Sequence, residues 1–188
     1  TTVTKDSDVP SGQGFGSSLK IDVTTADAFG TSNDLALLRT VFEGQDLQQL
    51  ASGTSSAKAV TLSFWVKSTI TGTYIASLEN YDTSSRVNSV AYTVNTSNTW
   101  EKKTITFSGD TSGGFNNDNG PSLEVRFWLG AGTNYTTGTL PSGWAADVNA
   151  NKGVGQVNSL SSTSNNIYLT GVQLELGSVA TDFEHRSY

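Results

Sequence analysis

The chain contains no cysteine and no methionine, and it has only three prolines and one histidine. Without cysteine it cannot form disulfides or thiolate metal sites. Its charged residues are few, 15% of 188, and its net charge of −6 leaves no basic surface for a nucleic-acid backbone. No apolar run approaches the roughly 18 residues of a transmembrane helix, and no signal peptide is recognisable. Because methionine is missing even at position 1, we expect a fragment or a processed product of a longer protein.

Small polar residues take the place of the missing types. The chain has 26 threonines, 25 serines and 19 glycines. Threonine fits the half-buried surface of a pleated sheet, while serine and glycine populate turns. The composition therefore predicts an all-β domain with many turns, and the length suits one domain.

Eight segments show the period-two alternation of strands between turn residues. They are Ser18–Val23, Leu35–Glu43, Lys58–Lys67, Gly72–Glu79, Ser89–Val94, Trp100–Phe107, Leu123–Leu129 and Ile167–Leu176. Helical periodicity is limited to one or two turns at Gly44–Ala51. We predict an antiparallel β-sandwich of jelly-roll type over residues 1–188, in which 1–16 is a linker or a first strand and 177–188 is a C-terminal tail.

The alternation also predicts which side chains form the core. One face of each of two strands is apolar: Val60, Leu62, Phe64 and Val66 in the first, and Leu123, Val125, Phe127 and Leu129 in the second. These faces should meet between the two sheets. The opposite faces each carry a tryptophan beside a cation, Trp65 with Lys67 and Trp128 with Arg126.

The sequence contains no recognisable catalytic motif. Its only histidine, His185, lies in the charged tail, and neither a Gly-x-Ser-x-Gly nor a phosphate-loop pattern is present. Glycosidases use two facing carboxylates, and the strand residues Glu79, Glu101, Glu124 and Glu175 leave such a pair open. No spacing singles out two of them, and carboxylates on solvent-facing strands are common. We therefore predict a protein that is not an enzyme.

A structural calcium ion is the one cofactor that the sequence leaves open. The segment Asn116–Gly120 (NNDNG) is rich in oxygen ligands, but the EF-hand spacing fails because phenylalanine and arginine would occupy two ligand positions. An isolated site formed by Asp6, Asp8 and Glu175 is the remaining candidate. The alternative is ordinary turn chemistry, in which asparagine and aspartate are frequent.

Sugar binding is the function for which the sequence offers the most candidate residues. Aromatic rings can stack on the C–H faces of sugars while polar side chains bind the hydroxyls. Candidates come from the second strand faces and from the irregular segment Gly130–Asn166, whose length is typical of functional loops. They are Trp65, Arg126, Trp128, Asn134, Tyr135, Trp144 and Asp147. The alternatives are that Trp65 and Trp128 pack beneath the long loop and that Trp144 fixes the loop to the sheet.

Particular stretches resemble known domains. LSFWVKS at Leu62–Ser68, followed by GTY at Gly72–Tyr74, resembles the strand pair of carbohydrate-binding-module-like jelly rolls. More widely, the chain resembles a recurrent domain of tailed-bacteriophage virion proteins, found in tail fibres and related appendages. The matching stretches are Val9–Ala28, Glu43–Ser68, Asn98–Gly113, Arg126–Leu140 and Gly171–Tyr188. In the last of these, Asp182 stands where such proteins often have proline, which is a minor departure.

The resemblance implies a jelly-roll module displayed outside the cell on a virion, with other virion proteins as partners and a homo-oligomeric, often trimeric, assembly. It brings no catalytic motif. Our first hypothesis is an adhesin that recognises host-surface polysaccharide. The alternative is a purely structural module that docks through the tail Phe183–Tyr188 and touches no receptor, and a depolymerase is a distant third.

Overall fold

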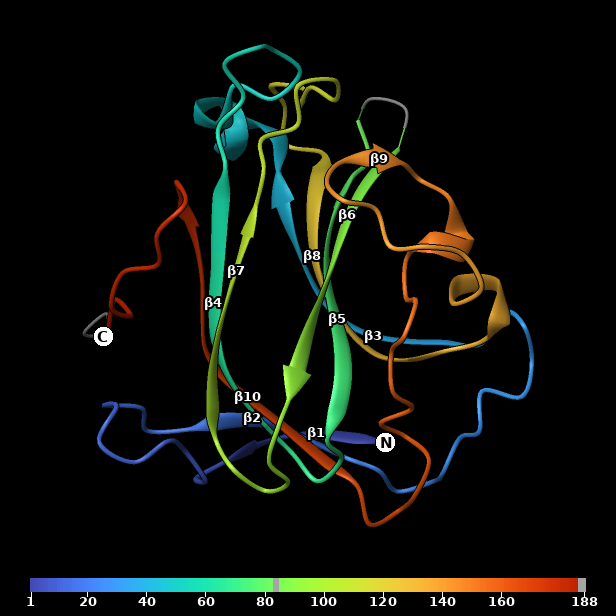
Figure 1. Cartoon of the computed structure of the whole chain (residues 1–188). Helices are drawn as coiled ribbons and strands as arrows, with labels where there is room; N and C mark the ends of the chain where they lie inside the picture. Colours follow the sequence, from blue (N-terminus) through green and yellow to red (C-terminus); the bar gives the residue numbers. More distant parts are fainter. Residues whose placement is uncertain (83–84, 186–188) are drawn as a thin grey trace.

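The structure is a computed structural model that describes residues 1–82 and 85–185 (Figure 1). Within these residues, ten strands form two antiparallel sheets of five strands each. The first sheet has the order β1 (Thr2–Asp6), β2 (Ser18–Asp22), β10 (Asn166–Leu176), β4 (Val60–Ser68) and β7 (Glu101–Phe107). The second has the order β3 (Leu35–Glu43), β8 (Pro121–Ala131), β5 (Gly72–Asn80), β6 (Arg86–Val94) and β9 (Ala145–Ala146). The predicted β-sandwich of jelly-roll type is confirmed.

The strand predictions hold with small shifts of the ends. The N-terminal segment contains a first strand, β1, which pairs antiparallel with β2. Strand β6 begins at Arg86 rather than at Ser89, because its pairing with β5 continues to Asn80. The two-residue strand β9 was not predicted, since so short a segment has no detectable alternation.

Helical structure is limited to short 3-10 turns. The predicted turns form η1 (Gly44–Leu50), which buries Leu47 and Leu50 against the core. The other two, η2 (Thr133–Tyr135) and η3 (Asn149–Asn151), lie in the long segment after β8. Across the described part of the chain, no helix has the length and apolar character required to cross a membrane.

The core lies between the sheets and is formed by the predicted faces. All eight apolar residues predicted from β4 and β8 belong to the core cluster. Phe64 of the first sheet meets Phe127 of the second edge to face, with ring centroids 4.9 Å apart. Tyr92 of β6 packs edge-on against Phe64 at 5.1 Å. Each fully buried side chain of this size contributes about 1.5–3 kcal/mol to folding.

The outer faces of the sheets differ from our expectation, because loops cover much of them. We expected strand carboxylates to face solvent, but Glu79 and Glu124 on the second sheet are only 2% and 4% exposed. The long segment between β8 and β10 covers this face and contributes Lys152, which binds Glu79. On the first sheet, the β1–β2 connection covers Lys67 and places Asp8 against it.

Candidate functional site

A pocket of about 250 Å³ opens on the outer face of the first sheet beside Trp65. Alternation along β4 turns Ser63 and Trp65 away from the core, and the register sets Trp65 between Lys102 of β7 and Thr170 of β10. The β1–β2 connection and the tail complete the walls. The lining side chains are Gln13, Phe15, Ser63, Trp65, Lys102, Asp182, Phe183 and His185.

Three aromatic rings hold the two loop walls together. Phe15 from the β1–β2 connection meets Phe183 and His185 from the tail, with centroids 5.1 Å and 5.0 Å away, and those two rings are 5.0 Å from each other. The Phe15–Phe183 and Phe183–His185 pairs are edge to face, and such pairs add about 0.5–1.5 kcal/mol beyond area burial. The ring nitrogen Nε2 of His185 also lies 3.1 Å from the carbonyl oxygen of Gln13, so it donates to this oxygen when it carries the proton.

A β-bulge in β10 makes room for this aromatic cluster. The pairing of β10 with β4 shifts between Thr170 and Gln173, and Gly171 adopts a φ of +59° there. A Cβ at Gly171 would lie 2.5 Å from the ring of Phe15. Glycine is therefore needed here both for its left-handed backbone and for the close approach of Phe15.

The described part of the tail is fixed to β10 by polar side chains. Gln173 Oε1 accepts a hydrogen bond of 2.9 Å from the backbone N–H of Glu184. Glu175 accepts bonds from the hydroxyl of Thr181, at 2.5 Å, and from its backbone N–H, at 3.1 Å. The hydroxyl bond is the main cause of the lowered pKa of Glu175. Of the predicted tail, Asp182, Phe183 and His185 line the pocket. Arg186, Ser187 and Tyr188 lie outside the described residues.

A second, wider groove of about 1120 Å³ runs along β10 on the far side of the aromatic cluster. Phe15, Phe183 and His185 line both hollows and so form a ridge between them. The groove also contacts Lys5, Gln173 and Glu175. Val172–Leu176 of β10 line this groove, while β4 contributes Ser63 and Trp65 to the pocket on the other side of the ridge.

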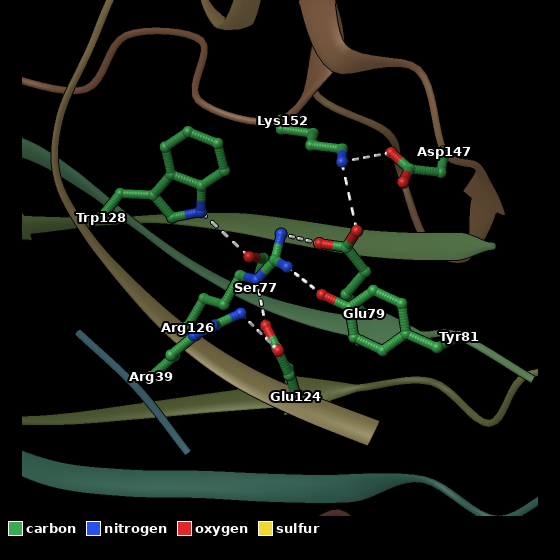
Figure 2. A network of polar contacts seen from close by, with 9 residues as sticks. All are labelled: Arg39, Ser77, Glu79, Tyr81, Glu124, Arg126, Trp128, Asp147 and Lys152. Carbon is green, nitrogen blue, oxygen red and sulfur yellow. Dashed lines mark hydrogen bonds and ion pairs between the residues drawn. The ribbon is translucent and has the colours of Figure 1, made fainter. Parts of the chain in front are cut away.

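A buried polar network occupies the outer face of the second sheet (Figure 2). Arg126 forms ion pairs with Glu79 and with Glu124, the latter at 2.6 Å. Lys152 Nζ reaches down from the long segment to Glu79 at 3.2 Å and to Asp147 at 2.5 Å. All these groups are largely buried, so their charges depend on one another for compensation.

The edge of the network reaches the surface through Arg39. This residue binds Glu124 at 2.8 Å, and its side chain is 59% exposed. Burial, with the nearby charge of Arg39 as a smaller cause, lowers the pKa of Arg126 to about 10. Burial and the hydrogen bond with Glu124 raise the pKa of Tyr81, whose hydroxyl also accepts a bond from Arg126. With Arg39 included, the network contains three cations and three carboxylates, so its charges balance. They are Arg39, Arg126 and Lys152, and Glu79, Glu124 and Asp147.

The structure separates the residues predicted for sugar binding. Trp128 is 1% exposed and donates from Nε1 to Ser77 Oγ at 3.0 Å, beneath the long segment (Figure 2). Arg126 is 8% exposed and belongs to the buried network. We predicted that Trp128 and Arg126 bind sugar at the surface, but both are buried, because the long segment covers their face of the sheet. Trp65 alone of the predicted set lines the pocket of the first sheet.

The loop candidates hold the long segment in place. Trp144 donates from Nε1 to the carbonyl of Ser108 at 2.7 Å, so it fixes the loop, as the alternative stated. Tyr135 lies against Trp128 with centroids 6.0 Å apart. Asp147 pairs with Lys152, and the Asn134 amide donates to the side chain of Asn33.

The residues considered for calcium are not gathered around one point. Asp6 accepts the backbone N–H of Asp8 at 2.8 Å, which is a local turn contact. Asp8 binds Lys67 and accepts from Trp100 Nε1 at 2.9 Å, and the hydrogen bond from Lys67 is the main cause of its lowered pKa. Within residues 1–82 and 85–185, no group of three histidine, cysteine, aspartate or glutamate residues is arranged to hold a metal ion.

No protein-family model matches the chain, and neither does any curated protein sequence. Among solved structures, the chain is similar to the enzymatically active domain of tailspike protein 4 of bacteriophage CBA120, with a TM-score of 0.50 and 18% identity over 93% of this chain. The chain spans only 18% of that tailspike chain. At this identity the likeness shows the fold alone.

Two carbohydrate-binding modules are also similar in shape. One is a family 16 module, with a TM-score of 0.40 and 12% identity over 92% of this chain and 84% of the module. The other is a family 4 module, with a TM-score of 0.41 and 17% identity over 93% of this chain and 77% of the module.

Proposed function

We propose that this domain is a non-catalytic carbohydrate-binding module of a bacteriophage virion that recognises a host-surface polysaccharide. The observation that carries the proposal is the Trp65 pocket. There a half-buried indole on a strand shares a pocket with a lysine, Lys102, and an aspartate, Asp182.

The chemistry of the pocket suits a sugar ring. An indole face binds the C–H surface of a pyranose, and the polar groups around it bind hydroxyls as donors and acceptors. Ser63 and Gln13 add neutral partners of both kinds to the two charged residues, Lys102 and Asp182. Because the pocket contains both signs of charge, it favours no strongly charged ligand.

The shape of the surrounding surface fits a polymer. The pocket volume of about 250 Å³ is below the usual range of about 300–1,000 Å³ for whole small-molecule sites, which matches one unit of a longer chain. The adjoining groove along β10 would take further units beyond the Phe15–Phe183 ridge. We therefore propose a site that grips a polysaccharide along its length.

The virion context is supported by the sequence resemblance, together with the fold shared with a phage tailspike domain. On this proposal the module is displayed outside the cell on a tail fibre or another appendage, beside other virion proteins. A homo-oligomer is expected, with a trimer as the first state to test. We propose no catalysis, although that tailspike domain is described as enzymatically active, because Glu79 and Glu124 are held in buried ion pairs.

The test is binding of the purified domain to intact cells of a candidate host, with and without competing surface polysaccharide. Saturable binding that polysaccharide blocks is expected, with loss of about tenfold or more in Trp65→Ala and partial retention in Trp65→Phe, which keeps a stacking ring. Trp144→Phe is the matched control, because that indole serves the long loop and should not affect binding. Binding that is absent, or that survives Trp65→Ala unchanged, would contradict the proposal.

A further inference from the structure

An apolar hollow of about 390 Å³ opens between the two sheets on the side where β3 is the edge strand. Its floor consists of the buried core residues Leu62, Val125 and Phe127. Half-buried apolar side chains from β2, β3 and β10 surround the opening, and they are Leu19, Leu38, Phe42 and Leu174. We call this hollow the apolar slot, because it leads from the surface to the core.

The slot is open because two strand edges meet there without a strand between them. The pairing of β10 with β2 extends only from Asn166 to Leu169. Beyond it, no strand of the described residues lies beside Gly171–Leu176 on the side away from β4. Strand β3 is likewise the edge of the second sheet. The space between the inner faces is therefore left unfilled at this point.

The walls of the slot limit what can occupy it. Thr40, at the exposed rim, carries the only hydroxyl among the lining side chains, and Arg39 directs its guanidinium to Glu124 at 2.8 Å on the outer face. A sugar or a peptide backbone would bring donors and acceptors that hydrocarbon walls cannot satisfy. Cavities lined in this way stay dry and take apolar molecules. Packed sheets lie about 10 Å apart, so the slot suits a single layer of hydrocarbon.

A cation stands at the opening. The wide groove along β10 adjoins the slot, since Val172 and Leu174 line both, and Lys5 of β1 lines the groove. Lys5 lies directly opposite Leu19 in the register of β1 and β2, so both side chains leave the sheet on the face of the slot. Within residues 1–82 and 85–185 the ammonium of Lys5 takes part in no ion pair.

The nearby acidic residues are directed away from the slot. Alternation along β10 turns Glu175 to the outer face, where the tail binds its carboxylate. Glu184 is held over the same outer face through its backbone N–H. Asp6 follows Lys5 along β1 and leaves the strand on the opposite face. The opening therefore combines an apolar cavity with a cation that has no counter-ion.

We infer that the domain binds a fatty acid, whose unbranched hydrocarbon chain fills the apolar slot while its carboxylate lies beside Lys5. The slot volume is within the usual range of about 300–1,000 Å³ for small-molecule sites. This inference goes beyond the glycan binding proposed above and does not depend on it, because Trp65, Lys102 and Asp182 do not line the slot.

The test is calorimetric titration of the purified domain with hexanoate, octanoate and decanoate, each kept below its micelle concentration. Saturable binding of one molecule per domain is expected. The affinity should rise about threefold to fourfold for each methylene added, because each one leaves water for the slot. In isotope-labelled protein, the methyl groups of Leu38 and Leu62 should show the largest NMR shifts on binding.

A matched pair of variants locates the site. Val172→Asp places a negative charge where the slot meets the wide groove and should weaken decanoate binding about tenfold or more. Val41→Asp is the control: Val41 is 45% exposed against 41% for Val172, but it lies opposite Glu124 on the outer face, so binding should stay within about twofold. Lys5→Gln should weaken binding about twofold to fivefold, and Lys5→Arg should restore it.

The inference is overturned if no fatty acid binds, if the three chain lengths bind equally, or if the shifts arise away from Leu38 and Leu62. Decyl maltoside that binds as tightly as decanoate would overturn the assignment of the carboxylate to Lys5. A dimer with the methyl groups of Leu38 and Val172 buried between the copies would show that a second copy covers the slot, which also overturns it. Trp65→Ala should leave decanoate binding unchanged, so the glycan site and the slot fail separately.

Discussion

Glu79 and Glu124 lie directly opposite each other on β5 and β8, and Arg126 forms an ion pair with both. Two like charges in this register destabilise a sheet when they stand alone. Here the guanidinium compensates both, and Lys152 supplies a second positive charge to Glu79. From the sequence, these two glutamates were among four candidates for a hydrolytic carboxylate pair. In the structure both are engaged in ion pairs that stabilise the fold.

We expect Arg126→Leu to lower the free energy of unfolding by about 3–5 kcal/mol, because it leaves two buried carboxylates short of a counter-ion. Denaturant unfolding followed by tryptophan fluorescence measures the change. Arg39→Ala is the control. It removes a cation from the same network, but that side chain is 59% exposed, so a loss of only about 0–1 kcal/mol is expected. Equal losses in the two variants would contradict our description of the network.

We expect the ion pairs of Lys152 to be the main contacts that hold the long segment against the second sheet. Lys152 is 6% exposed and bridges Glu79 to Asp147. Lys152→Met removes this bridge and should speed proteolytic cleavage between residues 130 and 166, which limited proteolysis with mass spectrometry detects. Lys58→Met, at an exposed site, should leave the cleavage rate unchanged. If both variants are cleaved like the unmodified protein, other contacts hold the segment.

The sequence predicts the sandwich well because alternation reports which side of a strand is apolar. Leu62, Phe64, Leu123 and Phe127 were placed in the core by this pattern alone, and the structure confirms each of them. The same pattern could not place Trp128, because a tryptophan on the second face is compatible with both solvent and a covering loop. Only the long segment above it decides, and irregular loops have no periodicity.

The candidate site was predicted only in part for a similar reason. Trp65 was recognised by its residue type, but its neighbours come from three distant segments. Lys102 meets it through strand register, and Phe15 and Phe183 meet through loop conformation. One signal in the sequence did point to this site. Gly171 is an isolated glycine within a strand pattern, and such a glycine indicates a bulge or the close approach of another group.

Glu101 should make the stability of the domain depend on pH between about 4.5 and 2. Burial opposes its charge, but hydrogen bonds from Lys103 and from Thr96 and Asn95 outweigh this and lower its pKa to about 2 from 4.5. Between these values the unfolded chain binds more protons, so the contribution of this group is present above about pH 4.5 and is lost as the pH falls toward 2. Because solvent is near, we expect a contribution of about 1–2 kcal/mol.

The check is unfolding as a function of pH for Glu101→Gln. Its stability should change less between about pH 4.5 and 2 than that of the unmodified domain, because glutamine does not titrate. Glu43→Gln, an exposed strand residue, serves as the control. A slope that is identical in Glu101→Gln and the unmodified protein would show that the hydrogen bonds do not favour the charged form.

Gly171 should connect the bulge of β10 to ligand binding. A Cβ there would lie 2.5 Å from Phe15, so Gly171→Ala must displace the ring that joins both loop walls of the Trp65 pocket. Gly177 is the control: it also has a positive φ, of +107°, but a Cβ there meets nothing within 4 Å. Both variants should lose stability through backbone strain, by about 1 kcal/mol or more. Only Gly171→Ala should also weaken polysaccharide binding, as measured by calorimetry on the folded variants. If Gly177→Ala weakens binding equally, strain in the backbone and not the position of Phe15 controls the pocket.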